Sequence, residues 1–258
     1  MLAKTNDADP AWDYTHQAEY YEYRPNYERT AIVEMLARAG IVSEEQLVAD
    51  VGAGTANLTL LLLAEGCRCV AIEPNDAMRS IGQRRTAGQR VSWLVGTGER
   101  TGLNERSVDL FAMGSSFNTT DRAATLREAH RVLRPGRHFA CMWNHRDVEG
   151  DAVQARVESI LRELFAGYQP GTRREDQTAL LGSAEGFSDL TYIERTQQVR
   201  QTRDRYVAAW RSVKNRFWDI GTEVGAAAFA RFEAVLMAEL PEVIEITYST
   251  RIWMIRAD

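Results

Sequence analysis

The sequence predicts an α/β protein with a doubly wound, Rossmann-like and mostly parallel seven-stranded sheet and an inserted helical cap. Three observations predict this class. Apolar runs of strand length alternate with segments of helical periodicity over the first 147 residues. The turn Gly52-Ala53-Gly54 directly follows the first of those runs. The chain has 258 residues, 45% of them hydrophobic, and can therefore bury one large core, with or without a cap.

The elements expected in the first half are read from local signals. Short apolar runs predict strands at 47–51, 68–72, 91–95, 108–113 and 138–143. The helices between them are bounded by capping residues and by glycine or proline. Their expected limits are Thr30 to Gly40, 56–65 before Gly66, a start at Asn75 or Asp76, and Asp121 to Pro135-Gly136. Strands that alternate with helices in this way form a parallel sheet.

The alternation of strands and helices changes after residue 147. The remaining elements are expected as a helix at 153–164, a Gly/Pro/charge-rich connector at 167–177, a strand at 191–199, helices at 206–218 and 222–240, and a last strand at 243–255. Helices inserted between strands five and six are expected to cap the strand ends, where such sheets bind ligands, although they could instead cover a sheet edge. The chain is accordingly divided into an N-terminal lid 1–29, a core 30–147, a helical cap with strand six at 148–240, and a last core strand 241–258.

Composition excludes several classes of partner. A net charge of −5 and a pI of about 5.6 argue against nucleic acid, which favours a basic surface. Cys67, Cys69 and Cys141 lie in apolar runs without metal-binding spacing, so we expect reduced core thiols, no metal, and a cytoplasmic protein. The apolar run 58–64 is too short to cross a bilayer, and the polar, acidic N-terminus does not resemble a signal peptide. The oligomeric state stays open.

The glycine turn and an acid 19 residues after Gly54 predict a nucleoside site. Glycines let the backbone approach a ligand closely. Glu73 ends the second strand, where a carboxylate can bind both hydroxyls of a ribose. A dinucleotide fingerprint requires a third glycine at the position that Asn57 occupies, so the pattern does not fit a dinucleotide.

Five segments carry a resemblance to a known family. The run 50–55 resembles motif I of the class I S-adenosylmethionine (SAM) dependent methyltransferases, and Glu73-Pro74-Asn75 resembles their motif II. Over roughly residues 15–147 the chain is similar to the small-molecule "type 11" members. Their lid motif Y-x-x-x-R-P-x-Y matches 20–27, and E-x-x-R-V-L-R-P-G-G matches 128–137 with Arg137 in place of the second glycine. Trp143-Asn144 followed by Arg146-Asp147 resembles W-N-x-R-D of one branch.

The resemblance implies SAM as cofactor, S-adenosyl-L-homocysteine as product, and a small-molecule methyl acceptor. The cofactor-binding residues that it implies are Tyr20, Arg24, Asp50, Gly52, Ala53, Gly54, Glu73, Pro74, Met78, Thr97, Gly98, Glu99, Gly114 and Ser115. Thr97 occupies the place of an acid that often binds the adenine amino group. The run 114–118 lacks the N-P-P-Y of enzymes that methylate exocyclic amines or amides.

Methyl transfer requires alignment of acceptor, methyl and sulfur, and exclusion of water. An acceptor that must lose a proton needs a base, and His145, His16 and Tyr14 are the candidates, although a solvated loop residue is the alternative for each histidine. Phe117, Asn118 and Trp143 are candidates for substrate binding, with buried packing as the alternative for the two aromatic residues.

The sequence favours a SAM-dependent methyltransferase that acts on O, N or C of a small molecule, such as an intermediate of a specialised metabolite. A noncatalytic SAM-binding sensor or scaffold remains an alternative. An NAD(P)-dependent oxidoreductase fits less well, because Trp210 stands four residues before Lys214 and no Tyr-x-x-x-Lys pair exists.

Overall fold

The computed structural model describes residues 13–169 and 175–258. The part of the expected lid that precedes Asp13, and residues 170–174 of the expected connector, lie outside the described residues. The seven strands form one sheet in the order β3-β2-β1-β4-β5-β7-β6. Their bounds are β1 Leu47–Val51, β2 Arg68–Ile72, β3 Val91–Leu94, β4 Val108–Gly114, β5 Leu133–Arg146, β6 Phe187–Thr202 and β7 Val243–Ala257.

The predicted fold class is confirmed. All pairs among the first five strands are parallel, and β7 is antiparallel to both β5 and β6. The helical elements are η2 Thr15–Tyr23, α1 Arg29–Arg38, α2 Asn57–Ala64, α3 Asp76–Arg85, η3 Phe117–Thr119, α4 Arg122–Val132, α5 Ala152–Leu164, α6 Thr178–Gly182, α7 Arg203–Arg211 and α8 Glu223–Glu239. None of the helices in the described ranges is long and apolar enough to cross a bilayer.

Both faces of the central sheet are covered by helices. On one face α1 and α2 bury apolar side chains against β1, β4 and β5. On the other, α4 and α6 pack against a cluster that includes Phe111 and Phe139. Because β1, β2 and β4 are enclosed in this way, they are almost continuously apolar rather than alternating, as expected of parallel strands buried on both faces.

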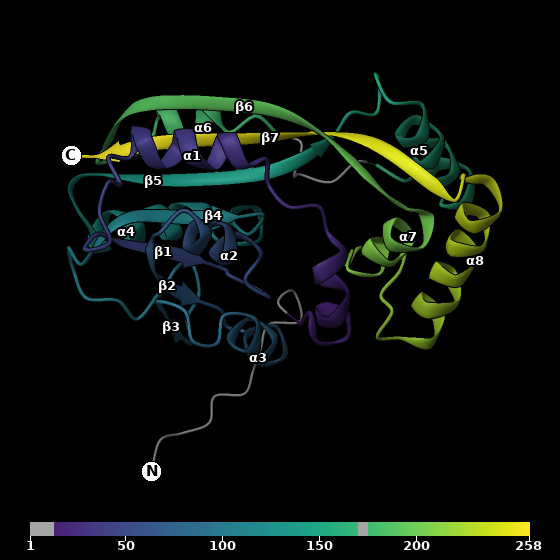
Figure 1. Cartoon of the computed structure of the whole chain (residues 1–258), viewed down its shortest axis with the longest axis horizontal. Helices are drawn as coiled ribbons and strands as arrows, with labels where there is room; N and C mark the ends of the chain where they lie inside the picture. The colour runs from purple at the N-terminus through teal and green to yellow at the C-terminus, as the bar shows by residue number, and fades with distance from the viewer. Residues whose placement is uncertain (1–12, 170–174) are drawn as a thin grey trace, which may run out of the picture.

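The antiparallel pair β6–β7 extends beyond the end of β5. β5 pairs with β7 only as far as Tyr248, whereas β6 continues to pair down to Val243. The overhang carries Ile244 and Ile246, which join α5, α7 and α8 in a third apolar cluster. Figure 1 shows these three helices gathered at the far end of β6 and β7, away from β1–β4. The cap therefore has its own core, built on the overhanging strands.

Several predicted boundaries were wrong for identifiable reasons. Glu28, not Thr30, caps α1, because its side chain accepts a hydrogen bond from the backbone of Ala31. The helix expected at 206–218 is α7, which ends at Arg211, and residues 212–222 form a loop. The helices between β5 and β6 build only part of the cap, since α7 and α8 follow β6.

The N-terminal helix η2 lies between the sheet and the cap. Hydrogen bonds between four pairs of residues join it and its flanks to α7 and the following loop: Gln17 to Asp219, Arg24 to Ser212, Arg205 to the carbonyl of Glu22, and Lys214 to the carbonyl of Asp13. On its other side, Asn57 of α2 donates to the carbonyl of Tyr21. The lid segment thus connects the cap to the loop that follows β1.

Gly82 of α3 is predicted to be intolerant of a side chain. A Cβ atom there would overlap the Trp93 ring and would lie 3.0 Å from the carbonyl oxygen of Gly54. Trp93 has little freedom to move, because its Nε1 donates to buried Thr86. Gly82→Ala should therefore lower the free energy of unfolding by about 1–3 kcal/mol in urea denaturation.

Gly182 is the matched control for this substitution. It also lies in a helix, but a Cβ atom would meet only Leu190 at 3.7 Å. Gly182→Ala should raise the free energy of unfolding by about 0.4–1 kcal/mol, because alanine restricts the unfolded chain. Equal effects of the two substitutions would contradict the close packing of α3 on Trp93.

Candidate functional site

The turn after β1 positions its backbone amides around the end of β2. Gly52 and Gly54 have φ angles of 72° and 57°, in the left-handed region that glycine adopts without strain. The amides of Gly52 and Ala53 donate to the carbonyl of Ile72. The amide of Gly54 donates to Oε2 of Glu73 at 2.9 Å. The turn and the second strand therefore form one rigid unit.

Glu73 is held at both carboxylate oxygens. Its Oε1 accepts from the amide of Asn75 at 2.9 Å. Burial raises the pKa of Glu73, although the amides of Asn75 and Gly54 and the charge of Arg79 oppose that rise. A carboxylate offers about four acceptor positions, so the two amides leave capacity for two further donors.

Asp50 is the second buried acid of the site. Its Oδ2 accepts from Thr59 at 2.6 Å, whereas Oδ1 has no hydrogen-bond partner among the described residues. Burial, with a smaller contribution from the charge of Glu73, raises the pKa of Asp50 to about 7. The carboxyl of Asp50 is therefore harder to ionise than usual, and it keeps one unsatisfied oxygen beside the glycine turn.

The end of β4 supplies the opposite wall. Ser115 has a φ of 59°, a conformation that is strained for a residue with a side chain. Its hydroxyl lies 2.9 Å from that of Tyr27, and its amide donates to the carbonyl of Met142. The Ser116 hydroxyl donates to the carbonyl of Val51, which joins the β4 loop to β1. The strain at Ser115 is thus maintained by contacts with the lid segment and with β5.

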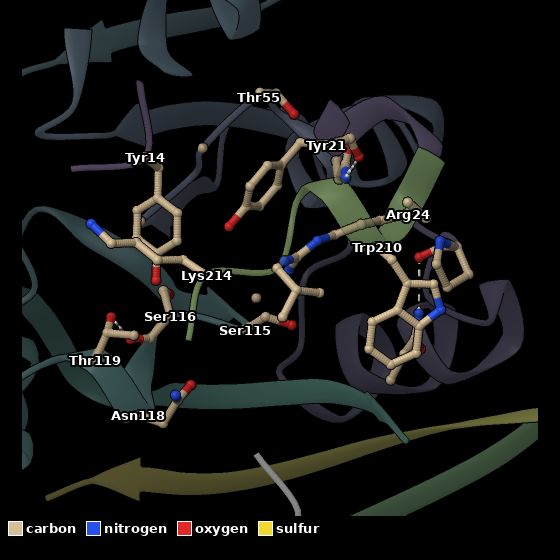
Figure 2. A pocket seen from close by; sticks show the side chains of 18 of the residues that line it. Tyr14, Tyr21, Arg24, Thr55, Ser115, Ser116, Asn118, Thr119, Trp210 and Lys214 are labelled. Carbon is tan, nitrogen blue, oxygen red and sulfur yellow. Dashed lines mark hydrogen bonds between the residues drawn. The ribbon is translucent and has the colours of Figure 1, made fainter. Parts of the chain in front are cut away.

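These elements border one cavity of about 600 Å³. Its walls come from the β1 turn, the ends of β2, β4 and β5, the lid segment, and the cap. Figure 2 shows Tyr21, Arg24 and Trp210 on one side of this space, Tyr14 and Lys214 on the other, and Ser115 and Ser116 along its floor. The cavity therefore joins the glycine turn to the cap.

Lid residues form part of the wall. Arg24 donates through Nε to the Ser212 hydroxyl at 2.7 Å and through Nη2 to the Ser212 carbonyl, and its guanidinium lies 4.0 Å from the centre of the Tyr21 ring. Tyr14 packs edge-on against Tyr21, with ring centres 6.1 Å apart. Arg24 is therefore bonded to the cap by two of its nitrogens while it lines the pocket.

The structure brings most of the predicted residues together at this cavity. Those that line it are Tyr14, Arg24, Asp50, Gly52, Ala53, Gly54, Glu73, Met78, Gly114, Ser115, Asn118 and His145. Those that lie outside its lining are His16, Tyr20, Pro74, Thr97, Gly98, Glu99, Phe117 and Trp143. The residues of this second group make other contacts.

His16 and Tyr20 face away from the cavity. Both border a smaller hollow beside α8, where Tyr20 lies under the guanidinium of Arg211. In the predicted adenine-binding segment, the Thr97 hydroxyl accepts from the amide of Arg100, and Glu99 accepts from the amide of Asp121 at the start of α4. Gly98 packs closely against the side chains of Thr120 and Thr125.

The two predicted aromatic walls are core residues. Phe117 is fully buried and packs on Phe139, with ring centres 5.2 Å apart. Trp143 is buried against Trp253, and its Nε1 donates to Oδ1 of Asn118 at 2.9 Å. Trp143 therefore acts on the pocket indirectly, because it orients Asn118 in the wall.

Sequence reasoning missed the cap side of the pocket. The cap and adjoining residues that line it are Arg146, Tyr168, Gln169, Tyr206, Ala209, Trp210, Val213, Lys214, Asn215, Arg216, Phe217, Trp218 and Tyr248. Arg146 could have been found, since it belongs to the W-N-x-R-D match. The aromatic residues near 206–218 read as the buried face of a helix, and only the actual end of α7 at Arg211 turns the following residues toward the pocket.

The fold is a Rossmann-like α/β fold with a cavity at the ends of its parallel strands, and comparison with known proteins identifies the family. Residues 49–141 match the methyltransferase domain family. A protein of Schizosaccharomyces pombe named as an uncharacterized methyltransferase is 31% identical over 177 residues, which cover 68% of each chain. The chain belongs to the methyltransferase family, as a class I member of the type 11 kind.

A second relative is an uncharacterized methyltransferase of Mycobacterium tuberculosis, 35% identical over 144 residues. The match spans 56% of the length of each chain, so the chain spans about half of this relative. Two solved structures share the fold. The YcgJ protein of Bacillus subtilis superposes with a TM-score of 0.55 at 15% identity, over 89% of this chain and 99% of that one. A geranyl diphosphate C-methyltransferase of Streptomyces coelicolor, in complex with Mg²⁺, geranyl-S-thiolodiphosphate and S-adenosyl-L-homocysteine, gives 0.50 at 12%, over 89% and 76%.

The raised pKa of Asp50 predicts a specific pH dependence of stability. The folded state holds a proton on Asp50 up to pH of about 7, whereas the unfolded chain releases it near 3.8. The stability that the neutral form contributes is therefore complete below 3.8 and is lost as the pH rises through about 7, with an upper limit of roughly 4 kcal/mol. Asp50→Asn should remove this loss, so the variant should gain stability relative to the wild type between pH 4 and pH 8.

Urea denaturation at pH 4, 6 and 8 measures this difference. Glu45→Gln, at an exposed position away from the site, is the control and should keep the pH profile of the wild type. Parallel profiles for Asp50→Asn and the wild type would show that Asp50 is ionised throughout.

Proposed function

We propose that this protein transfers a methyl group from SAM to O, N or C of a small molecule. One observation carries the proposal: a single cavity joins the Glu73 and glycine-turn unit to the aromatic residues of the cap. A nucleoside cofactor and a second small molecule can therefore be bound side by side. Membership of the methyltransferase family supports the same reaction.

The residues of the cavity fit each part of SAM. Glu73 has acceptor capacity for both ribose hydroxyls, and the unsatisfied Oδ1 of Asp50 can accept a hydrogen bond from the ammonium group of the amino-acid tail. Arg24 is placed to bind the carboxylate of that tail. The solved Streptomyces coelicolor relative binds S-adenosyl-L-homocysteine, the product of such a transfer.

The protein's contribution to the transfer is alignment and water exclusion. The leaving group is supplied by SAM itself, so the enzyme must hold the acceptor in line with methyl and sulfur. Gly114 ends β4 and Ser115 follows it at the edge of the cavity, where the reactive end of SAM is expected. Trp210, Phe217 and Trp218 of the cap keep water from the acceptor.

His145 and Tyr14 are the candidates for a base in the proposed reaction. Both line the cavity, on the end of β5 and on the lid segment, and a base must reach the acceptor through at most one water. His16 lines the smaller hollow instead. An acceptor that is already neutral and nucleophilic needs no base, in which case His145 only borders the pocket.

A noncatalytic sensor would use the same cofactor residues. The cap favours an enzyme over a sensor, because it extends the cavity beyond the space around the glycine turn. Turnover separates the two functions. Because the chain belongs to the methyltransferase family, the NAD(P)-dependent oxidoreductase is no longer an alternative.

The cofactor assignment predicts the effect of removing Glu73. Glu73→Ala should weaken S-adenosyl-L-homocysteine binding by roughly 10- to 150-fold, since hydrogen bonds to a charged group contribute about 1.5–3 kcal/mol. Isothermal titration calorimetry measures the affinity. Asp76→Ala is the matched control, because this neighbouring acid is exposed and lies outside the cavity. Tight NAD binding by the wild type, or unchanged affinity in Glu73→Ala, would refute the assignment.

The positions of the two histidines predict different kinetic effects. With an acceptor found by screening, His145→Ala should lower turnover by about 10²- to 10⁴-fold if His145 is the base, and should leave the affinity for SAM unchanged. His16→Ala should change turnover less than threefold, because His16 borders the other hollow. A loss below tenfold for His145→Ala would leave Tyr14 as the remaining candidate within the cavity.

A further inference from the structure

We propose that the methyl acceptor is an anion with a flat apolar body, and that its carboxylate binds at the cap end of the cavity against Arg146. The proposal rests on the proposed function, since it assigns the substrate class of the same pocket. It depends on the placement of charged and aromatic side chains on the two sides of the cavity.

Arg146 is a largely buried cation at the end of β5. Its Nη2 donates to Oε2 of Glu158 at 2.8 Å, and Glu158 is only 1% exposed. Its Nη1 is buried and makes no well-aligned hydrogen bond among the described residues, although the Tyr206 hydroxyl interacts with the guanidinium. An unsatisfied donor on a buried guanidinium is costly, so a ligand that accepts from it gains a strong, charge-assisted hydrogen bond.

The surroundings keep Arg146 charged and leave it access to the cavity. Burial lowers the pKa of Arg146, but Tyr206, Glu158, Tyr168 and Tyr248 together outweigh burial and raise it. The side chain is 16% exposed and lines the cavity, whereas Nη1 itself is covered. A carboxylate in the cavity can therefore contact the exposed part of the Arg146 side chain.

Charge is segregated along the cavity. Among the described lining residues the acids are Asp50 and Glu73, both beside the glycine turn. Of the lining bases, Arg146, Lys214 and Arg216 belong to the cap side, and Arg24 of the lid is bonded to Ser212 of the cap. The cofactor end thus favours cations, and the acceptor end favours an anion.

Aromatic side chains define the body of the acceptor. Trp210 lies over the guanidinium of Arg146, whose central carbon is 4.8 Å from the ring centre. Phe217 and Trp218 line the same side of the cavity. Flat aromatic walls favour a planar apolar ligand, and the stacked guanidinium orients its charged end. An aromatic carboxylic acid meets both requirements.

Binding to the wild-type protein tests the charge of the acceptor. S-adenosyl-L-homocysteine is titrated first by calorimetry. Indole-3-acetate, 4-hydroxybenzoate and the primary amide of each are then titrated in the presence and in the absence of S-adenosyl-L-homocysteine. Phenyl phosphate is titrated in the same way, as an aromatic anion without a carboxylate. We expect each acid to bind at least tenfold more tightly than its amide. Equal binding, no binding by either acid, or tighter binding of phenyl phosphate would overturn the proposal.

Variants of Arg146 test the site. Arg146→Lys keeps a charge for Glu158 but has no second forked nitrogen, so the preference for acid over amide should fall about tenfold while amide affinity stays unchanged. Arg162→Gln is the matched control: Arg162 also contacts Glu158, at 3.5 Å, but is 62% exposed and lies outside the cavity. Equal losses in the two variants would assign the effect to Glu158 and overturn the role of Arg146.

The two hypotheses fail in different ways. A protein that binds no S-adenosyl-L-homocysteine contradicts the proposed function, whatever the acids do. A protein that binds it but shows no preference for acids contradicts only the anionic acceptor. If Arg146→Lys does not fold, judged by its thermal melt, the comparison of acids and amides on the wild type still decides the question.

Discussion

The hydrogen bond between the Gly54 amide and the Glu73 carboxylate fixes the geometry on which the site depends. It joins the turn after β1 to the end of β2, and the Ile72 carbonyl reinforces the same junction through two more amides. The turn can approach β2 this closely because Gly52 and Gly54 adopt left-handed conformations. A Cβ at Gly52 would also collide with Ser116, so the loop after β4 can pack against the turn only because Gly52 has no side chain. One short backbone turn thus aligns three strand ends.

The second wall of the pocket depends on strand length rather than on a motif. β6 and β7 have 16 and 15 residues, and their overhang beyond β5 provides a surface on which α5, α7 and α8 bury an apolar cluster. At about 3.3 Å per residue these strands are roughly 50 Å long. Asp151, which caps α5, accepts from the amide of Thr247 and fixes the helix to the overhang. The cap is therefore held by strands of the same sheet that carries the glycine turn.

Much of the sheet and one half of the site could be predicted, because their signals are local. Gly52, Gly54 and Glu73 can be recognised by their residue types and their spacing, and buried parallel strands can be recognised as apolar runs. The cap half depends on where α7 ends, which no nearby glycine or proline marks: the loop begins at Ser212, whose hydroxyl is occupied by Arg24, 188 residues away. For the same reason the sequence does not show that His16 and Tyr20 border the smaller hollow, because helix η2 turns only one of its faces to the cavity. Long-range contacts of this kind leave no trace in a local pattern.

The distribution of charge has a consequence for the proposed methyl transfer. SAM carries its positive charge on the sulfur, and transfer of the methyl group removes that charge from the sulfur. Asp50 and Glu73 lie at the cofactor end of the cavity, so they favour the charged cofactor over its neutral sulfide product. At the acceptor end, a carboxylate held by Arg146 keeps its charge away from the reacting atom while the aromatic walls exclude water. The acceptor's charge then serves for binding and orientation. The attacking atom is whichever O, N or C atom the rigid aromatic body holds in line with the methyl group of SAM, beside Ser115.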